Sequence, residues 1–229
     1  MTAVFLGIDL AGSVRRPSGM AVLDEELKCR TWVRLSDDEI IDDVEVLKPA
    51  VVGVDAPLGL PRGRESLEKP GPPHFRLCDT ELRQRGIKFF PITIGPMRML
   101  TARGMRLAAV LRNKGVKVYE TYPGGVQDVL GLPRKQQGVA KLVKGLRKLG
   151  VKGLSTNITG DEVDAATCAL AAYLWWKGLC DELGNPDEGV IILPKPKGVR
   201  EALAPRRKRA ARKDCSQHPA RRAFSLSRL

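Results

Sequence analysis

Four aspartates occur where a folded chain could use their carboxylates together. Asp9 and Asp55 each end an apolar run, while Asp161 and Asp164 lie three residues apart just before a long apolar stretch. Residues three apart share a face of a helix, so the second pair would point in the same direction. Carboxylates brought close together repel one another unless a cation neutralises them. Hard divalent cations such as Mg²⁺ take oxygen ligands, so the set predicts a metal site.

The chemistry expected of such a site is phosphodiester hydrolysis. Two cations held about 4 Å apart can activate a water molecule and stabilise the leaving oxygen, without a serine, cysteine or histidine nucleophile. The five cysteines are widely spaced with no C-x-x-C pair, and His74 and His218 are the only histidines. This composition argues against a zinc site or a disulfide framework. We therefore predict Mg²⁺ or Mn²⁺ as the cofactor, in a two-metal site.

Each acid also has a purely structural interpretation. Asp161 could be the N-cap of a helix, with Glu162 and Asp164 as first-turn acids that complement the helix dipole. Asp55 precedes Ala-Pro-Leu-Gly and could be a turn former. Glu120 ends a third apolar run, and we include it in the predicted catalytic set, although the tyrosines around it could belong to a structural hydrogen-bond network.

Three apolar runs must position these side chains. Runs without polar alternation, bounded by glycine and proline, are typical of strands buried on both faces of a parallel or mixed sheet. Ligand sites in such sheets lie outside the carboxyl ends of the strands, which is where Asp9, Asp55 and Glu120 fall. The runs are residues 3–12, 49–59 and 116–125.

The remaining segments predict an α/β fold in which helices cover a mixed sheet. Residues 19–35 indicate an antiparallel hairpin, and the next helix begins at the cap residue Ser36 and ends before Pro49. Residues 56–75 are rich in glycine and proline and predict a long loop, a feature that is often functional. Further helices are predicted over residues 76–86, 97–115, 134–150 and from 161 onward, and a last short strand over 189–194.

The formal net charge of +13 is unevenly distributed. Residues 195–229 contribute +10, which leaves only +3 for the rest of the chain. This tail has few large apolar residues and no sustained helical stripe, so we predict one domain over residues 1–198 and a disordered basic tail over 199–229. Such a tail could bind phosphates without sequence preference, or it could be a solvated segment with no dedicated role.

No segment is predicted to cross a membrane. The longest nearly uncharged stretch, residues 165–176, is shorter than the ~20 residues that span a bilayer. The N-terminus lacks the pattern of a signal peptide. We therefore predict a cytoplasmic protein.

Five stretches of the sequence together resemble one protein family. They are similar to the family named domain of unknown function 429, whose members are described as predicted nucleases with a ribonuclease H-like fold. The resemblance implies a ribonuclease H-like, five-stranded mixed sheet flanked by helices, and a distant relationship to RuvC-type Holliday-junction resolvases. The stretches are "GIDLAGS", "VGVDAPLGLP", "RLCDTELRQRGIKFFP", "VYETYPGG" and "GDEVDAATCALAA", within residues 4–194.

The resemblance also implies roles for individual residues. In the wider superfamily, two metal ions are bound by an Asp on the first strand, an acid on the fourth, and an Asp-x-x-Asp that opens the last core helix. The matching positions are Asp9, Asp55, Asp161 and Asp164. Position 55 departs from the resolvases, which carry Glu there, and the change shortens the reach by one methylene. Resolvase-like activity would also call for a homodimer.

One matching stretch is not explained by metal chemistry. Arg76, Asp79 and Arg83 fall at helical spacing after the proline-rich loop. They predict a phosphate or substrate clamp in which Asp79 fixes an arginine. A solvated, salt-bridged helix face is the alternative.

Three functions follow from these observations. The leading prediction is a metal-dependent nuclease that acts on DNA or RNA. The alternative is a non-catalytic nucleic-acid-binding protein, although the eleven aromatic residues are few and those in "YLWW" are expected in the core, which disfavours a stacking platform. Actin-like and sugar-kinase ATPases share the fold, but "DLAGS" displaces the glycine of their first motif, they need two such domains, and no P-loop is present.

Overall fold

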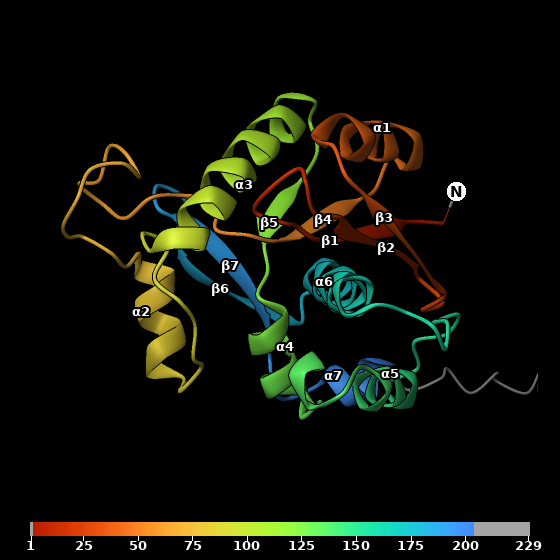
Figure 1. The fold of residues 1–229 in the computed structure, drawn as a ribbon. Helices are drawn as coiled ribbons and strands as arrows, with labels where there is room; N and C mark the ends of the chain where they lie inside the picture. Colours follow the sequence, from red (N-terminus) through yellow and green to blue (C-terminus); the bar gives the residue numbers. More distant parts are fainter. Residues whose placement is uncertain (1, 204–229) are drawn as a thin grey trace, which may run out of the picture.

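The computed structural model describes residues 2–203, and Figure 1 shows a central β-sheet with helices on both faces. Within this range the sheet has seven strands in the order β3-β2-β1-β4-β5-β7-β6. The strands β1, β4, β5 and β7 run parallel, while the pairs β1–β2, β2–β3 and β6–β7 are antiparallel. The predicted α/β class with a mixed sheet is therefore confirmed. The strands are β1 (Val4–Asp9), β2 (Ser18–Asp24), β3 (Cys29–Arg34), β4 (Val51–Asp55), β5 (Val118–Glu120), β6 (Cys180–Asn185) and β7 (Gly189–Pro194).

The helices form layers on the two faces of the sheet (Figure 1). Helices α1 and α3 cover one face. Helix α6 covers the other and lies between the sheet and the helices α4 and α5, with α7 beside α5. The helices are α1 (Asp37–Leu47), α2 (Leu77–Gln84), α3 (Gly95–Asn113), α4 (Pro123–Leu130), α5 (Val139–Lys148), α6 (Gly160–Trp176) and α7 (Val199–Leu203), with a 3₁₀ turn, η1, over Lys135–Gln137.

Each face of the sheet has its own hydrophobic core because strand side chains alternate. In β1, Phe5 packs into the core that contains α6, whereas Leu6 and Ile8 pack into the core that contains α1 and α3. Both cores are built mainly from buried aliphatic side chains. The strands are thus apolar on both faces, as the unbroken apolar runs predicted.

Helix α6 lies unusually close to the sheet because glycines face it. A Cβ on Gly7 would lie 2.0 Å from the carbonyl oxygen of Ala165, and a Cβ on Gly19 would lie 2.1 Å from that of Asp161. Only a residue without a side chain permits this approach. The helix contributes small residues in return, and every residue from Val163 to Leu174 is buried. The close contact brings the start of α6 to the end of β1.

Two elements differ from the sequence predictions. The five-stranded sheet is wrong, since seven strands are present within residues 2–203. The polar strand β6 was not predicted, yet it pairs with β7 along its whole length at the sheet edge. Helix α4 also escaped prediction because Pro-Gly-Gly resembles a turn, although proline suits the first position of a helix. Ser36 does form the predicted capping box, with Glu39.

The described part of the chain extends slightly beyond the predicted domain boundary. Residues 199–203 form α7, and Val199 and Leu203 are buried in the core that contains α6. The apolar spacing of these two residues anchors a segment that was assigned to the disordered tail. Residues 204–229, which make up the rest of that predicted tail, lie outside the described residues.

The described residues also bear on the cysteine and membrane predictions. Cys29, Cys78, Cys168 and Cys180 are buried free thiols, so no disulfide links them. Cys215 lies outside the described residues. Among the helices within residues 2–203, none has the length and apolar character needed to cross a bilayer.

Candidate active site

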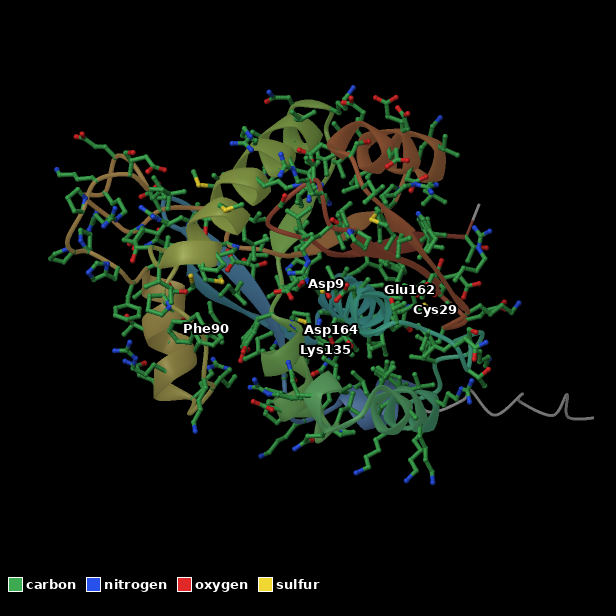
Figure 2. The ribbon with its side chains drawn as sticks, in the orientation of Figure 1. Asp9, Cys29, Phe90, Lys135, Glu162 and Asp164 are labelled. Carbon is green, nitrogen blue, oxygen red and sulfur yellow. The ribbon has the colours of Figure 1, made fainter. Side chains whose placement is uncertain are left out.

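The four predicted aspartates lie at the carboxyl end of the parallel strands. Asp9 and Asp55 end β1 and β4 and are register partners across that parallel pair. Both side chains point toward α6, because Gly7 and Gly53, two residues earlier, contact the backbone of that helix. The first turns of α6 supply Asp161 and Asp164. Figure 2 shows Asp9 and Asp164 close together at the centre of the molecule.

The ammonium group of Lys135 lies among these carboxylates (Figure 2). Its Nζ is 2.8 Å from Oδ2 of Asp164, 3.2 Å from Oδ2 of Asp9 and 3.3 Å from Oδ1 of Asp161. The 3₁₀ turn η1, between α4 and α5, carries this lysine to the site. Sequence reasoning missed Lys135, since it is one of several lysines and arginines in a basic stretch and no motif marks it.

The electrostatics of the cluster show that its negative charge is only partly compensated. Burial raises the pKa of Asp9 to about 7, against the opposing effect of Lys135 and with the help of Asp164 and Asp161. Burial also raises the pKa of Asp164, although Lys135 and a 2.7 Å hydrogen bond from Gln127 oppose the rise. For Lys135, burial alone would lower the pKa, but Asp9 and Asp164 raise it. The lysine is therefore held as a cation.

Asp55 is the least compensated of the four. Its carboxylate is partly buried, and the hydrogen bonds and ion pairs of residues 2–203 include none to its side chain. Burial raises its pKa well above the ordinary value, and Asp9 and Asp164 raise it further. A carboxylate without a partner at this position is suited to bind an added cation.

The four carboxylates are suitable ligands for a hard divalent cation, but their present positions do not form a metal site. Four carboxylates offer oxygen ligands of the kind that Mg²⁺ and Mn²⁺ prefer. Within residues 2–203, however, no three carboxylate, histidine or cysteine side chains converge closely enough to hold one metal ion as they stand. The ammonium of Lys135 occupies the centre of the cluster instead. A metal ion bound by these aspartates would have to displace it.

The helix-cap interpretation of Asp161 is wrong. Thr159 is the N-cap of α6, and its hydroxyl accepts from the backbone N–H of Glu162. Glu162 completes the capping box and also accepts from the hydroxyl of Thr31 at 2.9 Å. Because Thr159 and Glu162 fill the capping roles, Asp161 and Asp164 are free to face Lys135.

Glu120 lies near Asp55, with which it lines one pocket, but it is directed away from the group around Lys135. Its register partner in β4 is Val54, whose side chain faces the core that contains α1 and α3, so Glu120 points away from α6. Arg76 donates to both of its oxygens, at 2.6 and 2.7 Å, and the backbone N–H of Leu58 donates at 2.8 Å. The structure therefore brings Glu120 into a buried ion-pair cluster and not into the group around Lys135.

The residues of the predicted substrate clamp lie in two different environments. Asp79 does fix an arginine, since Arg76 donates to both of its oxygens, but both side chains are about 1–2% exposed. Arg83 lies on the exposed face of α2, with its guanidinium 4.2 Å from the centre of the Phe75 ring. Arg76 and Asp79 thus belong to the Glu120 cluster, whereas Arg83 is accessible to a ligand. Substrate binding by these residues stays a prediction.

Comparisons with known proteins extend the picture of the fold. The structure resembles that of Thermus thermophilus RuvC in complex with a Holliday junction substrate, with a TM-score of 0.44, 18% identity, and coverage of 82% of this chain and 99% of that one. A second Thermus thermophilus RuvC structure gives a TM-score of 0.42 at 18% identity, over 76% and 96% of the two chains. Both resemblances concern the fold. No curated protein sequence is significantly similar to the chain.

The family assignment rests on the sequence itself. The model of one family matches residues 7–189. This range holds all four aspartates, Lys135 and the Glu120 cluster, together with strands β2 to β6, the second half of β1 and the first residue of β7. The chain therefore belongs to the family described as protein of unknown function DUF429.

Proposed function

We propose that this protein is a metal-dependent nuclease that hydrolyses phosphodiester bonds in nucleic acid. One observation carries the proposal: four aspartates from β1, β4 and α6 share one end of the sheet, and Asp55 among them has no partner within the described residues. Structural acids are usually paired or hydrogen-bonded when they are buried. The Glu120 cluster in the same protein meets that rule, whereas Asp55 in the aspartate cluster does not.

Asp9, Asp55, Asp161 and Asp164 are the residues that would hold Mg²⁺ or Mn²⁺. A bound pair of such ions supplies an activated water molecule and neutralises the charge that develops on the leaving oxygen. The chain's own residues orient the donors: Gln127 donates to Oδ1 of Asp164, and the capping box of Thr159 and Glu162 fixes the first turn of α6. Lys135 neutralises the aspartates until the cations bind.

The charge of the chain supports an anionic polymer as the substrate. Residues before 195 carry a net charge of +3 despite the acidic cluster, and residues 195–229 add +10. Positive charge of this kind favours association with nucleic acid phosphates. We include both DNA and RNA in the proposal. The homodimer and the cytoplasmic location stay predictions.

The proposal is tested first by metal binding. Mn²⁺ would be titrated by calorimetry into the full chain and into the double variant Asp9→Asn/Asp164→Asn. Asp42→Asn, on the exposed face of α1, is the matched control. We expect saturable binding to the native chain and to the control, and none to the double variant, with all three folded by circular dichroism.

Cleavage is then measured on labelled single-stranded, duplex and branched substrates of DNA and RNA with Mg²⁺. Cleavage by the native chain that disappears in the double variant supports the proposal. Undiminished cleavage by the double variant would refute the site. Native protein that binds no Mn²⁺, even with nucleic acid present, would refute the metal mechanism.

A second candidate function is nucleic-acid binding without catalysis, and one observation favours it. Lys135 already forms ion pairs with three of the aspartates, and within the described residues the acids do not converge on a metal position as they stand. In that case the lysine is a permanent structural cation. Lys135→Met would then destabilise the fold without creating a metal site, whereas the nuclease proposal predicts that this variant binds Mn²⁺.

A further inference from the structure

A small pocket lies beside Asp55, at the carboxyl ends of β4 and β5. Its volume is about 170 Å³. Its lining includes Asp55, the aromatic residues Phe89 and Phe90, the apolar residues Met97 and Leu100, and the ion-pair cluster of Arg76, Asp79 and Glu120. A cavity of about 150 Å³ is large enough for a benzene-sized ring. The pocket therefore has room for one planar ring next to the aspartate cluster.

One residue that lines the pocket carries a buried hydroxyl group. It is Thr121, the residue after β5. Within residues 2–203, its hydroxyl oxygen is the only buried side-chain oxygen or nitrogen without an oxygen or nitrogen partner. The weakly polar thiol of Cys168 is its neighbour. Buried hydroxyl groups are normally paired, because leaving one unpaired is unfavourable. This hydroxyl therefore belongs to the contact between β5 and α6, and the polar lining of the pocket itself comes from Asp55 and from the ion-pair cluster of Arg76, Asp79 and Glu120.

An open groove continues from the pocket. It shares Phe89, Phe90 and Tyr122 with the pocket, and it adds the basic side chains of Arg83, Lys88 and Arg134. Among the described residues, neither Arg83 nor Lys88 has an acidic partner. Arg134 is paired with Asp128 and lies over the Tyr122 ring. The groove thus combines unpaired positive charge with aromatic surface.

Two details connect this groove to the aspartates. Arg134, which borders the groove, immediately precedes Lys135, which lies among the carboxylates. Phe90 is 70% exposed at the boundary between the groove and the pocket, and Figure 2 shows it on the α2 side of the cluster. Phe90 thus presents an aromatic face to a ligand that enters the groove.

We propose that the pocket and groove bind an unpaired nucleic acid strand, with one base stacked on Phe90 beside Asp55 and the flanking phosphates on Arg83 and Lys88. This inference rests on the proposed nuclease function and names its substrate: a single strand, or a duplex with an unpaired stretch. Aromatic faces stack on any base, and basic side chains follow the backbone, so the groove has the two features that bind single strands. A base in a duplex could not enter the pocket without leaving its stack.

The test compares two probes that differ only in their bases. A fluorescein-labelled oligothymidylate of roughly ten nucleotides, a length typical of strand-binding grooves, and an abasic oligomer of equal length would be titrated into the full chain. Anisotropy would be read in EDTA, so that no cleavage occurs. Both probes carry the same phosphates, so any contribution of the basic C-terminal residues to binding cancels in the comparison. We expect the oligothymidylate to bind about tenfold more tightly, as the stacking of one base implies.

Variants identify the residues that cause the preference. Phe90→Ala should remove most of the roughly tenfold preference for bases and leave abasic binding unchanged, while Phe90→Trp should preserve it. Lys88→Ala should weaken the binding of both probes equally. Val46→Ala is the matched control, because Val46 is an 81% exposed apolar residue on α1.

Three results would overturn the inference: equal affinity for the two probes, a base preference that survives in Phe90→Ala, or a blunt duplex bound as tightly as the single strand. The last two would leave Phe90 as a surface for another partner. The outcome is separate from that of the proposed function, since binding is measured without metal. If the native chain shows no Mg²⁺-dependent cleavage but keeps the base preference, the nuclease is refuted and the strand-binding groove stands.

Discussion

Two groups of buried acids lie at the same end of the sheet, and they are neutralised in different ways. In one, the planar guanidinium of Arg76 donates to both oxygens of Asp79 and both oxygens of Glu120, and the backbone of Leu58 adds a further bond. In the other, the single ammonium of Lys135 faces three aspartates, at 2.8 to 3.3 Å, and a fourth, Asp55, has no partner within residues 2–203.

The difference separates a structural cluster from an adaptable one. Arg76 has a rigid fork of donors that matches carboxylate geometry, so its cluster is saturated. Lys135 is a point charge on a flexible stem, 28% exposed, and can leave its position more easily. Acids that are both under-compensated and partly accessible are the ones available for a second cation. The comparison therefore supports the proposal that the aspartates bind a cation, and it predicts that Glu120 contributes to stability.

The sharpest test of that assignment is Asp55→Asn. If Asp55 holds a metal ion, the variant should lose more than about a hundredfold in Mg²⁺-dependent cleavage, because the interaction of the metal with the transition state contributes several kcal/mol. The folded structure should persist, since no side-chain partner of Asp55 is lost. Initial rates on the best substrate of the native chain would measure the effect. Asp42→Asn serves as the control, and a full rate in Asp55→Asn would remove this residue from the site.

Breaking the saturated cluster should instead reduce stability. Arg76→Met leaves Asp79 and Glu120 buried without their partner, and loss of one partner of a buried ion pair lowers the free energy of unfolding by about 3–5 kcal/mol. Urea denaturation at neutral pH would measure the change. The matched control is Arg85→Ala, whose ion pair with Asp181 is about 35–40% exposed and should contribute less than about 1 kcal/mol. Equal small effects in both variants would contradict the comparison.

Much of the fold could be predicted from the sequence because its signals are local. The apolar runs of β1 and β4, bounded by glycine and proline, identified buried parallel strands, and Ser36 with Glu39 identified the start of α1. Strand β6 was missed because its stability comes from pairing with β7 at the sheet edge, while its residues Asp181 and Glu182 are polar. Pairing of this kind is a tertiary effect that a local pattern does not contain.

For the candidate site, the sequence predicted which acids share an end of the sheet but not how they are neutralised. Asp9, Asp55, Asp161 and Asp164 do come together, because strand ends and helix starts follow from local patterns. The separation of Glu120 depends on its register opposite Val54, which the sequence does not reveal. Lys135 and Phe90 reach the site on connecting segments, whose course is set by packing.

The pH dependence of stability gives a smaller test. Burial, opposed by Lys135, raises the pKa of Asp9 to about 7, whereas an aspartate in an unfolded chain has a pKa of about 3.9. The folded state then holds the proton more tightly, so the stabilisation is present at low pH and is lost as pH rises toward 7. In EDTA, the native chain should lose about one to a few kcal/mol between roughly pH 5 and 7 relative to Asp9→Asn. Urea denaturation at each pH would measure the free energy of unfolding. If the native chain and Asp9→Asn show the same dependence on pH, the charge of Asp9 is fully compensated in the folded state.

The smallest expected effect concerns Lys135, the cation that lies among the aspartates. Lys135→Met removes the ammonium that competes with a metal ion for Asp9 and Asp164, so the affinity for Mn²⁺ should rise about three- to tenfold, or ~1 kcal/mol. Calorimetry would measure it, with Lys144→Met on the exposed face of α5 as the control. Unchanged affinity would show that the ammonium and the metal ion occupy different places. Weaker affinity for Mn²⁺ would mean that Lys135 stabilises the metal-bound state. The aspartates would then form a site that holds the lysine and the metal ion together.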